Sequence, residues 1–420
     1  MKTERQITVE KNSKKGIIVL YVAILLLLNF SGFALNAYIT NLASNNVSII
    51  NLETNTVIKT IAVGARPIGV CISPDSSNVY VANYDDNTVS VINTETNSVT
   101  ATIAVGTAPL GLCVSPDGSM IYVANDKSNT VSVINSITNT IVSTINVDKG
   151  PRGILVSLDG SKIYVTNNVS NTVSVINSSN NTIIATIPVG LSPFGLCISP
   201  DGYNVYITNL KSNSVNIINS HKNTVTDTIT VGQWPQGISI SPDGKTVYVA
   251  NSNENTVSVI NTISKKVTNT ITVGSYPQGI SVTPNGDSVY VANNNSNNVS
   301  VINTSTNKVT STIKVGSGPV AFGFFIYSYP SNGQQSVENI ESETIAVYPN
   351  PIISDVTVSF SEIQDKCTIS IINISGQIEK SFTFSGKQCT VGKENLQSGI
   401  YFIQVVNNNR LMLHKKIVVL

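Results

Sequence analysis

The chain has 420 residues, with 25 Lys and Arg against 24 Asp and Glu, so its net charge is +1. Hydrophobic residues make up 41% of the chain, which is enough for a large core and excludes global disorder. Charged residues are only 12%, and their balance argues against a nucleic-acid partner, which requires a basic surface. Two histidines and five cysteines offer few ligands for haem, copper or multi-histidine zinc. We therefore expect no cofactor, no metal and no nucleic acid.

The first 37 residues have the layout of a secretory signal peptide. A basic stretch precedes an apolar run over 16–33, and the small residues Ala34 and Ala37 then offer cleavage positions. We therefore predict a Sec-type signal peptide over 1–37 and export from the cytoplasm. The strongly apolar part, 17–28, is short for a membrane-spanning helix, but the run can be stretched to 18 residues, so an uncleaved anchor is the alternative.

A repeat of 42 residues fills most of the chain. Its clearest marker is a tyrosine that recurs in register: Tyr38, Tyr80, Tyr122, Tyr164, Tyr206, Tyr248 and Tyr290. Three asparagine series and one proline series keep the same register without insertion or deletion. Each unit holds four short runs rich in Val, Ile and Thr, separated by turn residues, and none has helical periodicity. This pattern predicts an all-β fold whose main part, residues 38–326, is a seven-bladed β-propeller.

The phase of the repeat also predicts how the ring closes. The first unit begins at the Tyr38 strand and lacks the innermost strand that starts Pro-x-Gly elsewhere. A seventh innermost strand, 319–326, follows the last unit. We expect this segment to pair beside the Tyr38 strand, because a closed ring leaves only short, protected sheet edges.

Three motifs carry a resemblance to a known family. They are Tyr-Val-Ala/Thr-Asn, Asn-Thr-Val-Ser-Val-Ile-Asn and Pro-x-Gly-Ile-x-Val-Ser-Pro-Asp-Gly, which recur through the seven units. The units closely resemble the YVTN family of β-propeller repeats, found in bacterial and archaeal surface and secreted proteins. The resemblance covers about 70% of the chain and implies a surface or secreted propeller.

A polar stretch over 327–343 has the composition of a linker, and a second β-rich segment, 344–420, follows it. This segment resembles the type A C-terminal sorting domain of the type IX secretion system of Bacteroidota, through Val347-Tyr-Pro-Asn-Pro351, Ile374-Ser-Gly-Gln-Ile378, Leu396-Gln-Ser-Gly-Ile-Tyr-Phe-Ile403 and Lys415-Lys-Ile-Val-Val-Leu420. The resemblance implies a small β-sandwich that the outer-membrane secretion machinery reads. The implied sorting-signal residues are Tyr348, Pro349, Asn350, Pro351, Gly376, Gly399, Tyr401, Lys415 and Lys416. Within the sandwich we expect Tyr401 in the core and Gly399 in a turn.

The remaining chemistry-bearing residues favour structural roles. Cys71, Cys113 and Cys197 share one phase on the innermost strand, which predicts buried free thiols. Cys367 and Cys389 lie in the tail domain, where an oxidising compartment leaves a disulfide between them open. Neither histidine has an evident nucleophile and carboxylate partner, so we nominate no catalytic residue. The asparagine series recur in every unit, which indicates a structural role in the turns of each blade and not a ligand site.

Residues that differ between blades are the better candidates for recognition. The blade-to-blade links vary, and we expect them to share a face with the turn between the second and third strands. Large aromatic and arginine side chains dominate binding hot spots. We therefore nominate Arg66, Arg152, Phe194, Trp234 and Tyr276 as a partner-binding face. The alternative is that these side chains only cover the blade junctions.

The sequence thus predicts a secreted or cell-surface propeller that works as a non-catalytic binding scaffold. Its partner could be a protein, a glycan or a second copy of the chain. One alternative is a structural component of a cell-surface coat. The other is a propeller enzyme of the hydrolase or lactonase kind, which the Ile, Val, Ser, Cys and Leu of the innermost strands disfavour because such enzymes need polar residues there.

Overall fold

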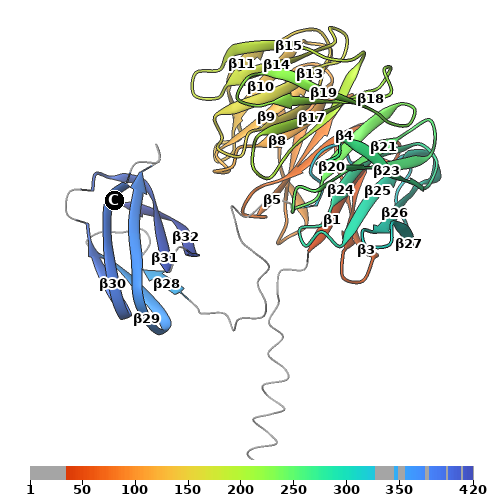
Figure 1. Cartoon of the computed structure of the whole chain (residues 1–420). Helices are drawn as coiled ribbons and strands as arrows, with labels where there is room; N and C mark the ends of the chain where they lie inside the picture. The colour runs from red at the N-terminus through yellow and green to blue at the C-terminus, as the bar shows by residue number, and fades with distance from the viewer. Residues whose placement is uncertain are drawn as a thin grey trace, which may run out of the picture. The chain divides into compact units, whose positions relative to one another are not determined.

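The computed structural model describes residues 35–326, 345–348, 355–373, 378–393, 396–407 and 410–419. The chain divides into two compact units, Met1–Gly333 and Gln334–Leu420 (Figure 1). The expected linker lies outside the described residues, and so does the expected signal peptide except for its last three positions. No helix in the described part of the chain is long and apolar enough to cross a membrane.

The first unit is a ring of seven antiparallel sheets (Figure 1), which confirms the predicted propeller. Six blades contain an innermost strand: β4 (Pro67–Ile72), β8 (Pro109–Val114), β12 (Pro151–Val156), β16 (Pro193–Ile198), β20 (Pro235–Ile240) and β24 (Pro277–Val282). The second strands carry the repeated tyrosine: β1 (Asn36–Asn41), β5 (Asn78–Asn83), β9 (Met120–Asn125), β13 (Lys162–Asn167), β17 (Asn204–Asn209), β21 (Thr246–Asn251) and β25 (Ser288–Asn293).

Two further strands complete each blade. The third strands are β2 (Asn46–Asn51), β6 (Thr88–Asn93), β10 (Thr130–Asn135), β14 (Thr172–Asn177), β18 (Ser214–Asn219), β22 (Thr256–Asn261) and β26 (Asn298–Asn303). The outermost strands are β3 (Thr56–Ala62), β7 (Ser98–Ala104), β11 (Thr140–Asn146), β15 (Thr182–Pro188), β19 (Thr224–Thr230), β23 (Lys266–Thr272) and β27 (Lys308–Lys314). A short 3-10 turn, η1 (Asn294–Ser296), precedes β26. Blades are numbered 1 to 7 from the sheet that contains β1.

Burial follows the position of a strand in its blade. The middle strands are buried on both faces, because each blade packs between two neighbours, and Tyr80 on β5 is only 2% exposed. The outermost strands bury one residue each near their ends, such as Ile103 on β7, and expose most of the others. The hydrophobic core is therefore a series of clusters between successive blades.

The asparagine series perform the predicted structural work. In blade 2, Asn83 donates from Nδ2 to two hydroxyls of β6, at 3.0 and 2.9 Å. Asn87 adopts a φ of 56°, and its Oδ1 accepts from the backbone N–H of Ala108 in the next link at 2.8 Å. Asn93 closes the following turn by accepting from the N–H of Thr96 at 2.9 Å. Each series therefore satisfies polar groups where a strand ends.

The innermost strands approach one another closely around the ring axis, and glycine makes this possible. A Cβ on Gly69 would lie 2.0 Å from the carbonyl oxygen of Leu110 in the next blade. The equivalent glycine of each later innermost strand meets the neighbouring backbone in the same way. The Pro-x-Gly motif thus marks a register shift near the start of each innermost strand and a direct backbone contact between blades.

The closing segment pairs with β1, as predicted, but only at its two ends. Bridges join Ala37 to Ile326 and Asn41 to Pro319, so blade 1 is completed by the end of the repeat. Between them the segment turns away from β1, because Ala321 and Gly323 take positive φ values of 46° and 118°. The expected continuous strand is therefore replaced by a loop that enters the centre of the ring.

The second unit is a five-stranded antiparallel sheet with its own core. Its strands are β28 (Ile345–Tyr348), β29 (Asp355–Asn373), β30 (Ile378–Gly392), β31 (Gly399–Asn407) and β32 (Arg410–Val419). Tyr401 is 8% exposed and lies in the core, as predicted. Gly399 is the first residue of β31 and pairs with Val419. Cys389 lies opposite Val358 and Cys367 opposite Phe384, and the two sulfurs are not bonded to each other.

Candidate binding face

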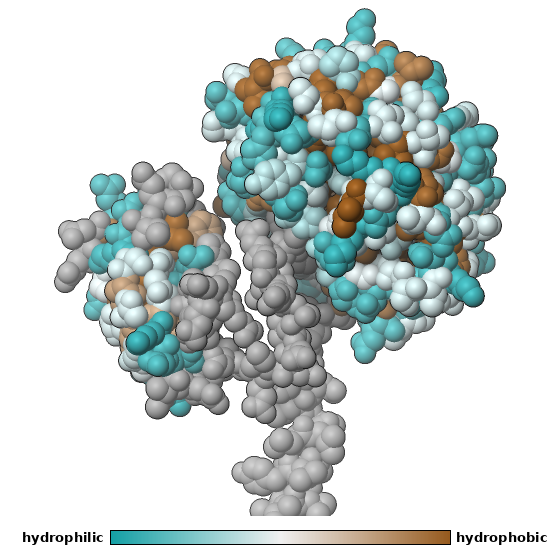
Figure 2. Space-filling view, in the orientation of Figure 1, coloured by the Kyte–Doolittle hydropathy of each residue, from teal (hydrophilic) through white to brown (hydrophobic). Residues whose placement is uncertain are grey.

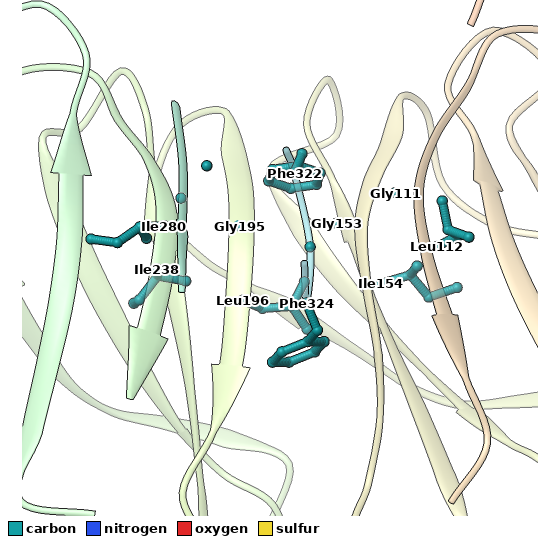
Figure 3. Close-up of a pocket in the computed structure, with 13 residues that line it drawn as sticks. Gly111, Leu112, Gly153, Ile154, Gly195, Leu196, Ile238, Ile280, Phe322 and Phe324 are labelled. Carbon is teal, nitrogen blue, oxygen red and sulfur yellow. The ribbon is translucent and has the colours of Figure 1, made fainter. Parts of the chain in front are cut away.

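The centre of the ring is a narrow channel lined by glycine backbone and aliphatic side chains (Figure 3). Glycine and aliphatic residues of five innermost strands line it: Gly111, Leu112, Gly153, Ile154, Gly195, Leu196, Gly237, Ile238, Gly279 and Ile280. Phe322, Gly323 and Phe324 of the closing segment complete the lining. The cavity that remains is about 30 Å³, enough for roughly two water molecules. The closing segment therefore plugs the channel, which has no room for a small-molecule ligand as it stands.

The channel wall offers little reactive chemistry. Its lining residues are glycine, aliphatic or aromatic, and none is titratable. The thiols of Cys71, Cys113 and Cys197 are buried free cysteines, as predicted, and burial raises the pKa of each. These thiols are therefore neutral at physiological pH, whereas a reactive cysteine needs a lowered pKa. Among the described residues, no three His, Cys, Asp or Glu side chains come together.

The blade-to-blade links and the turns between second and third strands share one face of the ring, as expected. The N–H of Tyr84 donates to the carbonyl of Arg66 at 3.1 Å, and the N–H of Ser252 donates to that of Trp234 at 3.1 Å. The equivalent bond recurs at the other five links. We call this surface the link face. The turns between innermost and second strands lie at the opposite face, because each innermost strand runs from one face to the other.

Large side chains occupy a backbone conformation on the link face that favours glycine. The last link residue has a positive φ in every blade, and it is glycine in two of them, Gly150 at 73° and Gly318 at 66°. Arg66, Trp234 and Tyr276 occupy the same place with φ values of 54°, 56° and 55°. A non-glycine residue in this region costs on the order of 1 kcal/mol. Three of the nominated residues therefore occupy positions at which glycine would adopt the same backbone conformation with less strain.

A network of charged and aromatic groups on the link face runs from the link between blades 1 and 2 to the turn of blade 3. The guanidinium of Arg66 lies 3.7 Å from the Asp85 carboxylate and 5.0 Å from the Tyr84 ring centre. The ammonium of Lys127 lies 5.7 Å from the same ring. Burial and the negative charge of Asp126 raise the pKa of Tyr84, so its hydroxyl stays protonated and donates to Asp126 at 3.5 Å. Two cations therefore lie within cation–π distance of this ring.

The network continues through Arg152 to the plug of the channel. Nε of Arg152 lies 3.6 Å from Asp126, and the guanidinium carbon lies 5.2 Å from the centre of the Phe194 ring. Phe194 packs edge-to-face against Phe322, with ring centres 5.0 Å apart at 77°. Phe194 is 8% exposed, so it supports the face from beneath. Arg152 is half-buried and presents the outer part of its side chain.

Exposed apolar side chains occupy another sector of the link face. Trp234 is 43% exposed, Leu191 in the preceding link is 54% exposed, and Val169 in the turn of blade 4 is 62% exposed. We call these three residues the apolar arc. Tyr276, in the link that follows Trp234, is half-buried. The link face thus combines a charged, aromatic sector with an apolar one, a combination common in recognition surfaces.

The five nominated residues therefore have unequal positions. Arg66, Trp234 and Tyr276 project from links, Arg152 is half-buried, and Phe194 packs in the mouth of the channel. Tyr84, Asp126, Val169 and Leu191 also lie on the link face and were not among the residues predicted from the sequence. The sequence could have pointed to Tyr84 and Asp126, because they are one repeat apart and therefore occupy equivalent turns of neighbouring blades.

Some of the nominated sorting residues lie outside the described residues: Pro349, Asn350, Pro351 and Gly376. Tyr348 ends β28 and pairs with Thr357. Lys415 and Lys416 lie on β32, opposite Ile403 and Phe402 of β31. The strand that ends the chain is therefore an edge strand of the second unit's sheet.

Comparisons with known proteins agree with this architecture. The family described as YNCE-like β-propeller matches residues 22–120, 73–157 and 244–325, which together make up more than half of the chain. The family described as lactonase, 7-bladed β-propeller, matches residues 137–263. The chain is therefore a β-propeller built from sequence repeats. It belongs to the YNCE-like β-propeller family. No curated protein gives a significant match.

The tail is a secretion signal. The family described as secretion system C-terminal sorting domain matches residues 346–420. The chain therefore carries a type IX sorting tail, which interacts with the secretion machinery and directs export to the cell surface or beyond it.

Two solved structures have a fold similar to part of this chain. Hydrazine synthase of Kuenenia stuttgartiensis aligns with a TM-score of 0.59 and 22% identity over 64% of this chain and 92% of that one. A protein of unknown function from Desulfotomaculum acetoxidans aligns with a TM-score of 0.60 and 19% identity over 69% of this chain and 99% of that one. At these identities the likeness concerns the fold.

Proposed function

We propose that the propeller is a non-catalytic recognition module, exported by its sorting tail, that binds a protein or glycan partner through the link face. The observation that carries the proposal is the trio Arg66, Trp234 and Tyr276 at positive φ, where glycine serves the same turn in two other links. Small residues serve the same turn in four links, as Gly150, Gly318, Ala108 and Ser192, so the turn itself does not require the three large side chains. Arginine, tryptophan and tyrosine are also the residues that contribute most to binding hot spots.

The two sectors of the link face define what a partner must offer. The apolar arc favours a hydrophobic or aromatic group, or the apolar face of a sugar ring, against Trp234. The charged sector supplies both signs, since Arg66 and Lys127 are cations and Asp85 and Asp126 are anions. A partner with a compact hydrogen-bonding group beside an apolar one satisfies both. Exposed charges such as Arg66 and Asp85 are screened by salt, so binding through the charged sector should weaken as the ionic strength rises.

Export of the mature propeller is the other part of the proposal. A Sec-type signal peptide would carry the chain across the inner membrane before the tail is read. Cleavage after Ala34 leaves β1 intact, whereas cleavage after Ala37 removes two residues that pair with β2. Ala37 is also fully buried and bridges the closing segment. We therefore place the cleavage after Ala34.

The experiment is a binding screen of the full-length protein against arrayed oligosaccharides and separated envelope proteins of the producing bacterium. The double variant Trp234→Gly/Tyr276→Gly converts two links to the glycine form found at Gly150. Tyr203→Ala is the matched control, because Tyr203 is an exposed aromatic residue, 54% accessible, in a turn at the opposite face. We expect the glycine variant to lose binding by at least about tenfold and the control to retain it. Equal loss in both, or no loss in the glycine variant, would refute the link face.

An enzymatic function is the second candidate, because the lactonase family matches residues 137–263. It requires a reactive group with access to substrate, and the plugged channel disfavours this. The test is hydrolysis of a panel of lactones and aryl esters by the full-length protein. Turnover that survives in Trp234→Gly/Tyr276→Gly would replace the binding proposal with a catalytic one.

A further inference from the structure

The link-face end of the channel is ringed by the residues that follow the repeated proline. Each innermost strand contributes one such residue, and the closing segment contributes another. We call these positions the mouth ring: Ile68, Leu110, Arg152, Phe194, Gln236, Gln278 and Val320. The apolar members are at most 8% exposed and form one cluster with Phe322, the plug side chain labelled in Figure 3. These members therefore pack around the plug.

The polar members of the mouth ring have unmet hydrogen-bonding groups. Nε of Arg152 and Oε1 of Gln278 are buried and have no hydrogen-bond partner among the residues that the structure describes. Unpaired asparagine oxygens also occur, but they recur in all seven blades and therefore belong to the repeat. Burial of a polar group without a partner is unfavourable, and Ile68 and Leu110 fill the same position without it. The fold itself therefore does not require polar side chains here.

The two glutamines of the mouth ring each follow an aromatic link residue. Trp234-Pro-Gln236 and Tyr276-Pro-Gln278 occupy the same phase of blades 6 and 7, and no other link ends in an aromatic residue. We call these two segments the aromatic–glutamine units. In Figure 2, hydrophobic residues on the visible face lie singly or in small groups among polar ones, so large apolar side chains with amides beside them fit a mixed, hydrogen-bonding surface. The chain therefore presents the same chemistry twice, in neighbouring blades.

Backbone contacts hold the two aromatic–glutamine units side by side. The N–H of Ser252 donates to the carbonyl of Trp234 at 3.1 Å, and its hydroxyl donates to the carbonyl of Pro277 at 2.6 Å. A Cβ on Gly237 would lie 2.2 Å from the carbonyl oxygen of Gln278, so β20 and β24 meet directly at the glutamines. One ligand can therefore contact both units at once.

The charge of the mouth ring is balanced. Arg152 is its one charged member, and Nε of this arginine lies 3.6 Å from the carboxylate of Asp126, whose side chain is 13% exposed. An anionic ligand on Arg152 would also approach Asp126, and the repulsion would offset the attraction. The mouth ring therefore favours a neutral ligand that carries hydrogen-bond donors and acceptors.

We propose that the mouth ring and the aromatic–glutamine units form a binding site for a neutral glycan. This inference rests on the proposed function of the link face and names the class of its partner. Sugar hydroxyls both donate and accept, so a glycan can donate to Oε1 of Gln278 and accept from Arg152. The C–H faces of sugar rings pack against aromatic side chains, which Trp234 and Tyr276 provide. Two equal units suit a chain of repeated sugars, whereas a protein surface presents a different group to each.

The test is isothermal titration calorimetry of the full-length protein with neutral oligosaccharides of glucose, xylose and mannose, and with oligogalacturonate as the acidic comparison. The variant Gln236→Leu/Gln278→Leu gives both positions the residue found at Leu110, so the fold tolerates it. The matched control is Gln233→Leu, because Gln233 is an exposed link residue outside the mouth ring. We expect the dissociation constant of a neutral oligosaccharide to rise at least about tenfold in the double variant and less than about twofold in the control.

The outcomes separate this inference from the proposed function. Loss confined to the glutamine variant, with an unfolding temperature at or above that of the wild type, supports the glycan site, because leucine removes an unpaired buried acceptor. No binding of any neutral oligosaccharide at about 1 mM overturns it, although a protein partner that requires Trp234 and Tyr276 would still support the link face. Glycan binding that the glutamine variant retains and Trp234→Gly/Tyr276→Gly loses overturns the mouth ring alone. Binding that both variants retain overturns the proposed function as well.

Discussion

Removal of the plug side chain provides a quantitative test of how the ring closes. Phe322 is 6% exposed and packs in the mouth of the channel against Phe194. Its backbone bonds, from its N–H to Ile68 at 3.2 Å and from Val70 to its carbonyl at 2.9 Å, do not depend on the side chain. Phe322→Ala therefore removes buried ring contacts while leaving the closure bonds in place. The expected loss of unfolding free energy is about 3–5 kcal/mol.

A double-mutant cycle with Phe194→Ala isolates the contact between the two rings. Edge-to-face aromatic pairs contribute about 0.5–1.5 kcal/mol beyond their burial. The sum of the free-energy losses of the two single variants should therefore exceed the loss in the double variant by about 0.5–1.5 kcal/mol. Phe322→Leu, which keeps an apolar side chain in the mouth, should lose much less than Phe322→Ala.

Denaturant unfolding of the full-length protein, followed at the propeller transition, provides the measurement. Ile263→Ala is the control, because Ile263 is 81% exposed in the turn between β22 and β23 and the expected change is within about 0.5 kcal/mol. A loss below about 1 kcal/mol for Phe322→Ala would refute the reasoning, because a ring buried in the channel mouth cannot be removed at so small a cost.

Three further predictions concern the turns and the buried thiols. Asn255 takes a φ of 59° and accepts from the next link's N–H at 2.9 Å, so Asn255→Ala should lose about 2 kcal/mol and Asn255→Gly about 1 kcal/mol in the same unfolding assay. Burial alone would raise the pKa of Asp117, but hydrogen bonds from neighbouring serines outweigh it and lower that pKa. The stability that this carboxylate adds is present above the unfolded-state pKa of about 3.9 and lost as the pH falls through the lowered value; Asp117→Asn, the residue type of the equivalent Asn285, should flatten this acid loss in thermal unfolding below about pH 4. The thiol of Cys113, whose pKa burial raises, should resist iodoacetamide in the native protein and react after unfolding, as read by peptide mass spectrometry; labelling in the native state would contradict its placement.

The repeat made the architecture predictable because its register is unbroken. Residues 42 apart occupy equivalent places, so the positions of strands, turns and links in one blade fix those in the others. The roles of Asn83, Asn87 and Asn93 followed from turn chemistry alone, since asparagine tolerates a positive φ and bonds local backbone groups.

The closing segment was predicted only in part, because its course depends on two backbone conformations. The departure from Pro-x-Gly at 319–326 marked the segment as unusual. The positive φ of Ala321, which turns Phe322 into the channel, had no signal in the sequence. The burial of Phe194 follows from that turn, and it was therefore equally hidden.

The candidate face was predictable in its place and less so in its members. Variation between links pointed to Trp234 and Tyr276, and the structure adds the positive φ that makes these residues costly to keep. The network around Tyr84 depends on side-chain orientations across three blades, which the repeat alone does not specify.

The link face itself can be tested most directly by hydrogen exchange of the full-length protein with and without the partner that the binding screen selects. Binding through this face predicts slower exchange in the links at 231–234 and 273–276 and in the turn at 84–87, with the opposite-face turn at 199–203 unchanged. Protection confined to 199–203, or to the outer strands β11 and β15, would contradict the assignment of recognition to the link face.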